Sequence, residues 1–94
     1  MTRPAAIITG GARGIGLACA EALAGAGFDI LIADLAETAP EGLAERIAKR
    51  GASLIYQRCD IADLPSHAAL VDAAMTGFGS IDCLVNNAGV GAVV

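Results

Sequence analysis

Residues 9–16, Thr-Gly-Gly-Ala-Arg-Gly-Ile-Gly, decide how the rest of this chain is interpreted. They follow an apolar run at 5–8 and precede an alanine-rich helical pattern, which predicts a strand, a glycine turn and a helix start. Because glycine has no Cβ, Gly10 can turn the chain sharply, Gly14 lets the main chain approach a bulky anion, and Gly16 lets the helix lie close to the sheet. The N–H groups of the first helical turn would then face a pyrophosphate. The alternative is a strand-to-helix turn that binds no ligand.

Apolar runs and helical patterns alternate outward from this loop. The sequence predicts strands at 5–9, 29–33, 53–58 and 82–85, and helices at 14–26, from Thr38 to Gly51 and from near Pro65 to Phe78. Alternation with connections of this length favours an α/β fold with a Rossmann-type doubly wound parallel sheet, in strand order 3-2-1-4. That order places the glycine loop beside the end of the fourth strand, at the switch point where ligands bind in such sheets.

Three features of the helices and strands can be predicted in more detail. The first helix is expected to bury Ile15, Ala18, Cys19, Ala22 and Leu23, and to end at Gly27 with Phe28 folding back onto Leu23. The second helix should bury Leu43 and Ile47, and the third should bury Leu70, Val71, Ala74 and Phe78. The third strand should place Leu54 and Tyr56 on one sheet face and Ile55 on the other.

Composition narrows the class of protein. The 94 residues are 55% hydrophobic and only 3% aromatic, which indicates one aliphatic core at most. A net charge of −4, with no basic patch larger than 46–50, argues against a nucleic-acid partner. No apolar run is long enough for a membrane span and no signal peptide is visible, so a cytoplasmic location is expected. Cys19, Cys59 and Cys83 are widely spaced, which favours reduced cysteines and no metal site.

The predicted sheet leaves the outer edge of the strand at 82–85 unpaired, and one of its faces lies under a single helix. An open apolar edge of this kind is an aggregation liability. We therefore expect residues 1–94 to be the N-terminal part of a single larger dinucleotide-binding domain.

Two acidic residues follow predicted strands. Asp34 comes eighteen residues after Gly16, close to where this fold places the acid that accepts hydrogen bonds from an adenosine ribose. Its charge would repel a 2′-phosphate. The alternative is a capping role in the turn at 34–37. Asp60 follows the third strand, and its spacing is equally compatible with a cap of the next turn.

Two strings together resemble the short-chain dehydrogenase/reductase family. The first is Thr9-Gly10-x-x-x-Gly14-Ile15-Gly16, and the second is Asn86-Asn87-Ala88-Gly89 at the end of the fourth strand. The resemblance spans nearly all of the chain, and 3-oxoacyl-[acyl-carrier-protein] reductases are the type that it suggests. It implies an NAD(P)-dependent oxidoreductase that moves a hydride between the cofactor and a carbonyl or alcohol substrate. It also implies a homo-oligomer.

The resemblance, joined to the strand-end reasoning, gives a set of cofactor-binding candidates. They are Gly10, Arg13, Gly14, Ile15, Gly16, Asp34, Asp60, Ile61, Asn86, Ala88 and Gly89. By resemblance, Asp60 and Ile61 contact the adenine, whereas Asn86, Ala88 and Gly89 border the cofactor. Asn87 is interpreted as a structural tie.

The choice of cofactor depends on two opposed residues. In the family, a basic residue at the position of Arg13 often accompanies NADP use, whereas Asp34 favours NAD. Because no second cation follows the second strand, we predict NAD, with NADP as the alternative.

The family's proton exchange uses a serine and a Tyr-x-x-x-Lys pair. Here Tyr56 has Asp60 where the lysine belongs, so Tyr56 is interpreted as a core residue. No catalytic residue is assigned within the chain, and the catalytic residues are expected beyond residue 94. The main alternative function is a non-catalytic dinucleotide-binding sensor or structural protein. An S-adenosylmethionine-dependent methyltransferase is a third reading, which the paired strings disfavour.

Overall fold

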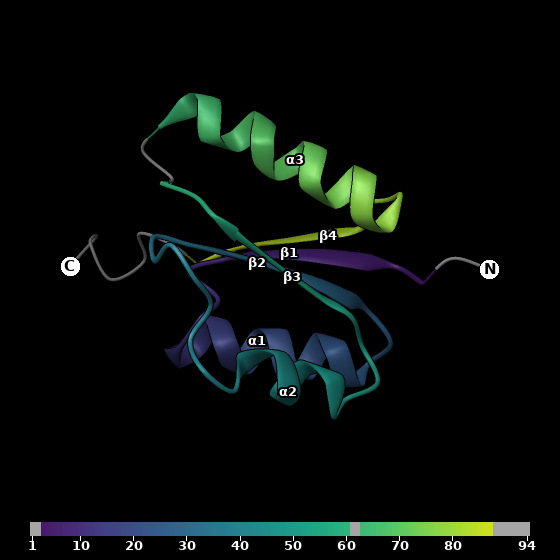
Figure 1. The fold of residues 1–94 in the computed structure, drawn as a ribbon. Coiled ribbons are helices and arrows are strands. Elements are labelled where there is room, and N and C mark those ends of the chain that lie inside the picture. The colour runs from purple at the N-terminus through teal and green to yellow at the C-terminus, as the bar shows by residue number, and fades with distance from the viewer. Residues whose placement is uncertain (1–2, 61–62, 88–94) are drawn as a thin grey trace.

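The computed structural model describes residues 3–60 and 63–87. Its elements are β1 (Ala5–Thr9), α1 (Gly14–Gly25), β2 (Asp29–Asp34), α2 (Leu43–Ala48), β3 (Leu54–Arg58), α3 (Leu64–Phe78) and β4 (Cys83–Asn86). All strand pairs are parallel, and the order β3-β2-β1-β4 confirms the predicted doubly wound sheet. Figure 1 shows three layers, with α1 and α2 on one face of the sheet and α3 alone on the other.

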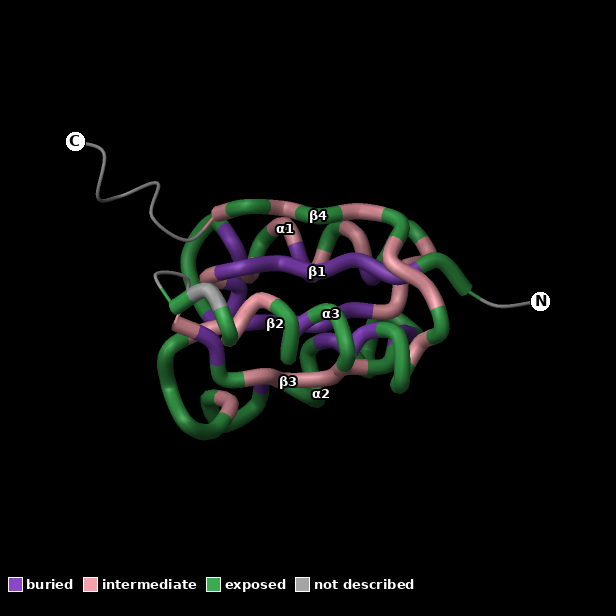
Figure 2. Tube along the Cα trace, turned by 90° about the horizontal axis from the view of Figure 1, so that it is seen from above, coloured by how far each residue is buried: buried purple, intermediate pink, exposed green. Residues whose placement is uncertain are grey.

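The core consists of two aliphatic clusters separated by the sheet. One cluster lies between the sheet and α1 with α2, and the other lies between the sheet and α3. Every residue of β1 is buried, and so is the interior of β2, as expected when both sheet faces are covered. The outer strands β3 and β4 are less buried (Figure 2). In β3, Leu54 and Tyr56 pack against the first cluster and Ile55 against the second, as predicted.

The buried face of α1 differs from the prediction. The residues that pack on the sheet are Gly16, Ala20 and Ala24. Ile15 is 74% exposed, and Ala18 and Ala22 are also exposed, whereas Cys19 and Leu23 are half-buried. At Gly16 the reason is steric, because an added Cβ would collide with the Gly10 carbonyl oxygen of the glycine loop. An apolar periodicity that gives weight to large side chains therefore selects the wrong stripe.

The end of α1 agrees with the prediction. Gly27 has a φ of 106°, a conformation that favours glycine. The backbone N–H of Phe28 donates to the carbonyl of Leu23 at 3.0 Å, and the N–H of Gly27 donates to the carbonyl of Ala24 at 3.1 Å. This paired bonding is the Schellman motif, and it directs the chain straight into β2.

The second helix is shorter than predicted. It begins at Leu43 instead of near Thr38, and Gly42 precedes it with a φ of 86°. A residue in that conformation cannot lie within a right-handed helix, so the signals at Thr38 and Pro40 belong to a connecting segment. Leu43 and Ile47 are buried as expected.

The third helix begins at Leu64 after Asp63, with Pro65 in its first turn, as predicted. Leu70 and Ala74 are buried and Phe78 packs against the same cluster. Val71, which was expected to be buried, is 47% exposed. The helix packs over β1, β2 and β3, so Val71 turns toward the uncovered side of β4.

Candidate functional site

The glycine loop turns the chain from β1 into α1 with two residues that require glycine-like geometry. Gly10 has a φ of 65° and Gly14 a φ of 62°. The N–H of Gly10 donates to the carbonyl of Ala33 at 2.7 Å, which ties the turn to the end of β2. Arg13 is extended and forms no side-chain cap on α1. The first turn of α1 therefore has no side-chain cap and is available to an anion.

Gly14 and Gly16 have different structural roles. A Cβ added at Gly14 would meet no atom within 4 Å, so the space in front of it is open. A Cβ added at Gly16 would collide with the carbonyl oxygen of Gly10 and lie 2.7 Å from Nδ2 of Asn87. Gly16 thus permits close packing. Gly14 leaves an open space in front of the loop that a side chain would fill, and we call this space the cradle. The close packing predicted at Gly16 is confirmed.

Asn87 joins the end of β4 to this loop. Its Nδ2 donates to the Gly10 carbonyl at 3.1 Å in a partly buried position, which agrees with its interpretation as a structural tie. The Thr9 hydroxyl lies 3.4 Å from the Val85 carbonyl and 3.3 Å from Oδ1 of Asn86. Thr9 was quoted in the loop string without a role of its own. A hydroxyl at the end of an otherwise apolar strand indicates a buried hydrogen-bonding partner, and Thr9 is indeed buried.

Asp34 lies at the carboxyl end of β2, beside the glycine loop. Its Oδ2 accepts a hydrogen bond from the Ala12 N–H at 3.2 Å, and its Oδ1 accepts one from the Leu35 N–H at 2.8 Å. The carboxylate therefore caps the turn after β2 and also faces the loop after β1. The capping role considered for it is therefore observed, and the carboxylate keeps acceptor sites that these two bonds do not use.

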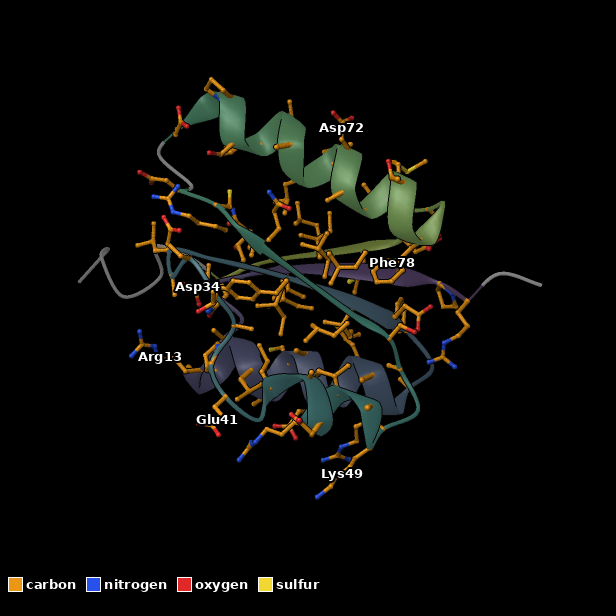
Figure 3. The ribbon with its side chains drawn as sticks, viewed as in Figure 1. Arg13, Asp34, Glu41, Lys49, Asp72 and Phe78 are labelled. Carbon is orange, nitrogen blue, oxygen red and sulfur yellow. The ribbon has the colours of Figure 1, made fainter. Side chains whose placement is uncertain are left out.

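Arg13 and Asp34 occupy the same end of the molecule without forming a pair. Figure 3 shows the Arg13 side chain extending away from the ribbon, below Asp34. Arg13 is exposed and Asp34 is half-buried, and no ion pair joins them within the part of the chain that the structure describes. Asp34 is thus fixed by backbone donors, whereas Arg13 is not held by the site.

The remaining candidates divide into those that the structure describes and those that it does not. Asp60 follows β3, and the N–H of the preceding Cys59 donates to the Asp34 carbonyl at 2.8 Å, so the ends of β2 and β3 lie together. Ile15 is exposed at the start of α1. Ile61, Ala88 and Gly89 lie outside the described residues. Gly10, Arg13, Gly14, Ile15, Gly16, Asp34, Asp60 and Asn86 all lie at or next to the carboxyl edge of the sheet.

Asn86 points differently from Asn87. Its side chain lines a hollow of about 350 Å³ between α3 and the sheet, together with Thr9 and His67 at the polar end and Ile7, Leu70, Val71, Ile81 and Leu84 elsewhere. Leu84 is 62% exposed there. The hollow is mostly apolar and lies on the face opposite α1. It is therefore separate from the cradle at Gly14.

Tyr56, Ser66 and Ser80 have structural partners. The Tyr56 hydroxyl donates to the Ala36 carbonyl at 2.8 Å, Ser66 donates to Asp63 at 3.0 Å, and Ser80 donates to Asp82 at 2.9 Å. Burial, followed by the charge of Asp34, raises the pKa of the Tyr56 phenol, which keeps it protonated. A tyrosine that exchanges a proton with the carbonyl or alcohol oxygen of a substrate near neutral pH would need a lowered pKa instead.

Two features are absent from residues 3–60 and 63–87. No helix there combines the length and apolar character needed to cross a membrane. No group of three or more His, Cys, Asp or Glu side chains there is placed to hold a metal ion.

Comparison with known proteins gives a consistent family. The family described as short chain dehydrogenase matches residues 4–94. The chain is 44% identical over 85 residues to cis-4-hydroxycyclohexanecarboxylate dehydrogenase of Sinomonas cyclohexanicum, covering 90% of this chain and 34% of that protein. It is 44% identical over 88 residues to L-rhamnose 1-dehydrogenase (NAD(P)(+)) of Azotobacter vinelandii, covering 89% of this chain and 34% of that one. The chain thus spans about a third of the length of these relatives.

Solved structures agree with the fold. The crystal structure of 3-oxoacyl-[acyl-carrier protein] reductase from Brucella melitensis in complex with NAD matches with a TM-score of 0.88 and 45% identity, over 100% of this chain and 36% of that one. Hydroxysteroid dehydrogenase from Escherichia coli matches with a TM-score of 0.84 and 38% identity, over 94% of this chain and 37% of that one.

Proposed function

The chain belongs to the short-chain dehydrogenase family, and from that premise we propose that it binds a nicotinamide dinucleotide at the carboxyl edge of its sheet. It thereby supplies the cofactor-binding part of an oxidoreductase acting on a carbonyl or alcohol substrate. The observation that carries the proposal is the meeting of the open cradle at Gly14, the α1 N-terminus that no side chain caps, and Asp34 bonded to the loop at Ala12. That combination suits a ligand with both phosphates and ribose hydroxyls.

Different residues at the carboxyl edge of the sheet bind different parts of the dinucleotide. The first turn of α1 and the loop from Gly10 to Gly16 hold the pyrophosphate, and Asp34 accepts hydrogen bonds from the adenosine ribose. Asp60 and Ile61 border the adenine, and Asn86, Ala88 and Gly89 border the cofactor, as the family resemblance implies. When bound, the nicotinamide supplies the hydride chemistry. The chain's own residues bind and orient it.

We propose NAD as the preferred cofactor. The half-buried Asp34 carboxylate would repel a 2′-phosphate, and its position is fixed by the Ala12 and Leu35 N–H groups. Arg13 is exposed and unattached, so it offers a weaker counter-charge for NADP. Among the matched proteins, one structure is titled as a complex with NAD, and one relative's name includes NAD(P)(+).

The substrate class, assembly and location are also part of the proposal. The reported relatives are named as dehydrogenases or reductases of small molecules, which supports a small carbonyl or alcohol substrate. A cytoplasmic location is consistent with the free Cys19, Cys59 and Cys83. A homo-oligomer is proposed from the family alone. No observation favours a non-catalytic sensor.

Calorimetric titration of the purified protein with NADH and with NADPH tests the proposal. We expect saturable binding of both, with NADH bound roughly tenfold or more tightly because one repulsive charge contact is worth more than 1 kcal/mol. Absence of binding by either dinucleotide would overturn the cofactor assignment. Preference for NADPH would overturn the role given to Asp34 and leave dinucleotide binding in place.

A further inference from the structure

Tyr56 forms an unusual link for a residue on an outer strand. It lies on β3, in register with Ile32 of β2, and it packs against the core cluster between the sheet and helices α1 and α2. Its hydroxyl extends past the sheet and donates to the carbonyl oxygen of Ala36 at 2.8 Å. The tyrosine therefore connects the outer strand to the segment that follows Asp34.

That segment, residues 35–42, has few other anchors. Residues 35–38 are exposed, and Ala39 alone is packed against the core. At its start, the Leu35 N–H donates to the adjacent Asp34, and at its end the carbonyls of Pro40 and Gly42 accept hydrogen bonds from the N–H groups of Leu43 and Arg46 in α2. Among the hydrogen bonds of the described residues, the one from Tyr56 is the bond that ties this segment to a strand other than its own.

The link is close to the acid that selects the cofactor. Asp34 immediately precedes the segment, and its charge contributes to the raised pKa of the Tyr56 phenol, so the two side chains sense each other. Burial contributes more to the same shift. Since both effects favour the neutral phenol, the hydroxyl remains a donor to Ala36 across the physiological pH range.

Two segments of the chain thus hold the Asp34 carboxylate at the proposed ribose site. The glycine loop holds one carboxylate oxygen of Asp34 through the Ala12 N–H, and the 35–38 segment holds the other through the Leu35 N–H. The loop side is fixed by Gly10 and Asn87. The segment side depends on Tyr56.

We propose that Tyr56 is a positioning residue for the adenosine end of the cofactor: through the Ala36 carbonyl it fixes residues 35–38, and thereby the orientation of Asp34 that distinguishes a 2′-hydroxyl from a 2′-phosphate. This inference rests on the proposed function. It assigns a specificity role to a residue whose sequence context indicated only a core position. A purely structural Tyr56 would affect stability without changing the ratio of the two cofactor affinities.

Tyr56→Phe removes the hydroxyl and keeps the ring, and Ser80→Ala is its matched control. Ser80 also loses one exposed hydroxyl bond, to Asp82, but at the opposite edge of the sheet. Dissociation constants are measured for NADH, NADPH and reduced nicotinamide mononucleotide, which lacks the adenosine half. In Tyr56→Phe we expect NADH affinity to fall about threefold to tenfold, NADPH affinity to change less, and mononucleotide affinity to stay constant. Ser80→Ala should leave the NADH-to-NADPH ratio as in the wild type.

A second variant keeps the test independent of the aromatic ring. Ala36→Gly leaves Tyr56 intact and loosens the segment that it holds, so it should lower the same ratio. Equal ratios in wild type, Tyr56→Phe and Ala36→Gly would overturn the inference while leaving the proposed function standing. A uniform loss for all three ligands in Tyr56→Phe would also overturn it, because that is the pattern of a structural role. Failure of the wild type to bind either dinucleotide would instead overturn the proposed function itself.

Discussion

Strand β2 carries an aspartate at each end, and the two carboxylates are used differently. At its start, Oδ1 of Asp29 accepts hydrogen bonds from Nε of Arg3 at 2.9 Å and from the N–H of Ser53 at 3.0 Å. These bonds join β2 to the segments that lead into its two neighbouring strands. Asp82 does the same before β4, since its Oδ2 accepts from the Ala5 N–H at 2.9 Å.

At the other end, Asp34 also accepts backbone hydrogen bonds, from Ala12 and Leu35. Here, however, the partners belong to loops that lead into helices, and one of those loops contains the open cradle at Gly14. The residue type and the strand are the same at both ends. What differs is the neighbouring helix end, because the helices end at the amino edge, whereas the carboxyl edge has the α1 N-terminus. In a parallel sheet, an acid is therefore placed for ligand binding by the strand end on which it lies.

The largest expected effect is a change in the ratio of NADH to NADPH affinity when the aspartate at the carboxyl edge, and not the one at the amino edge, is substituted. Asp34→Arg removes the acceptor and the repulsion and adds a cation, so preference should reverse from NADH to NADPH, a change on the order of a hundredfold in the affinity ratio. Asp29→Asn should lower the unfolding temperature and leave that ratio unchanged. Titration of both variants with both cofactors measures this, and Asp34→Ala gives the intermediate value. A ratio that responds equally to Asp29→Asn would break the distinction.

The next effect concerns glycines at opposite edges. Gly14 and Gly79 both have positive φ, at 62° and 81°, and an added Cβ meets nothing within 4 Å at either. Alanine should therefore cost each position about 1–2 kcal/mol of stability. Only Gly14→Ala should weaken both NADH and NADPH, roughly tenfold, because its methyl group occupies the pyrophosphate cradle. If Gly79→Ala weakens binding as much, backbone strain and not the cradle accounts for the loss.

A smaller effect is expected at the tie between β4 and the glycine loop. Asn87→Ala removes the bond from Nδ2 to the Gly10 carbonyl and leaves that carbonyl without this donor. Stability should fall by about 1 kcal/mol, and both cofactors should bind a few-fold more weakly with their ratio unchanged. Thermal unfolding and titration of the same sample measure both quantities. Unchanged values for both would mean that the amide does not hold the loop.

The smallest effect is a pH dependence at the amino edge. The Ala5 N–H, followed by the Ser80 hydroxyl, holds the pKa of Asp82 below its ordinary value of 3.8. A lowered folded-state pKa means that the stabilisation is present above 3.8 and is lost as the pH falls through the folded-state pKa. Asp82→Asn should thus unfold at a lower temperature than the wild type near neutral pH, and the gap should close in acid. A gap that stays constant down to strong acid would rule out the carboxylate as its source.

The sequence predicted the strands better than the helix faces. Strand positions, strand order and the Gly27 cap could be predicted because apolar runs and glycines act locally. The buried stripe of α1 could not, because it consists of the small residues Gly16, Ala20 and Ala24, which an apolar periodicity weights little. At Gly16 the burial depends on how closely the loop at Gly10 approaches. The start of α2 was misplaced because Pro40 is a common helix-start residue, and only the conformation of Gly42 decides against it.

The candidate site also contains features that could be predicted from the sequence and features that could not. Asp34 could be located from its position after β2, and Gly14 and Gly16 from their spacing. The bond from Ala12 to Asp34 and the bond from Tyr56 to Ala36 could not, because each joins segments that are distant in sequence. A tyrosine on an apolar strand predicts burial alone, and only the path of residues 35–42 gives its hydroxyl a partner.

Mapping of backbone amide signals by NMR while NADH is added tests the central claim most directly, because it reports on both edges at once. We expect shifts at Gly10–Gly16, at Asp34 and Leu35, at Asp60 and at Asn87. We expect none at Asp29, Ser53 and Asp82. Shifts concentrated at the amino edge, or around Leu84 beside α3, with the glycine loop unaffected, would contradict the claim.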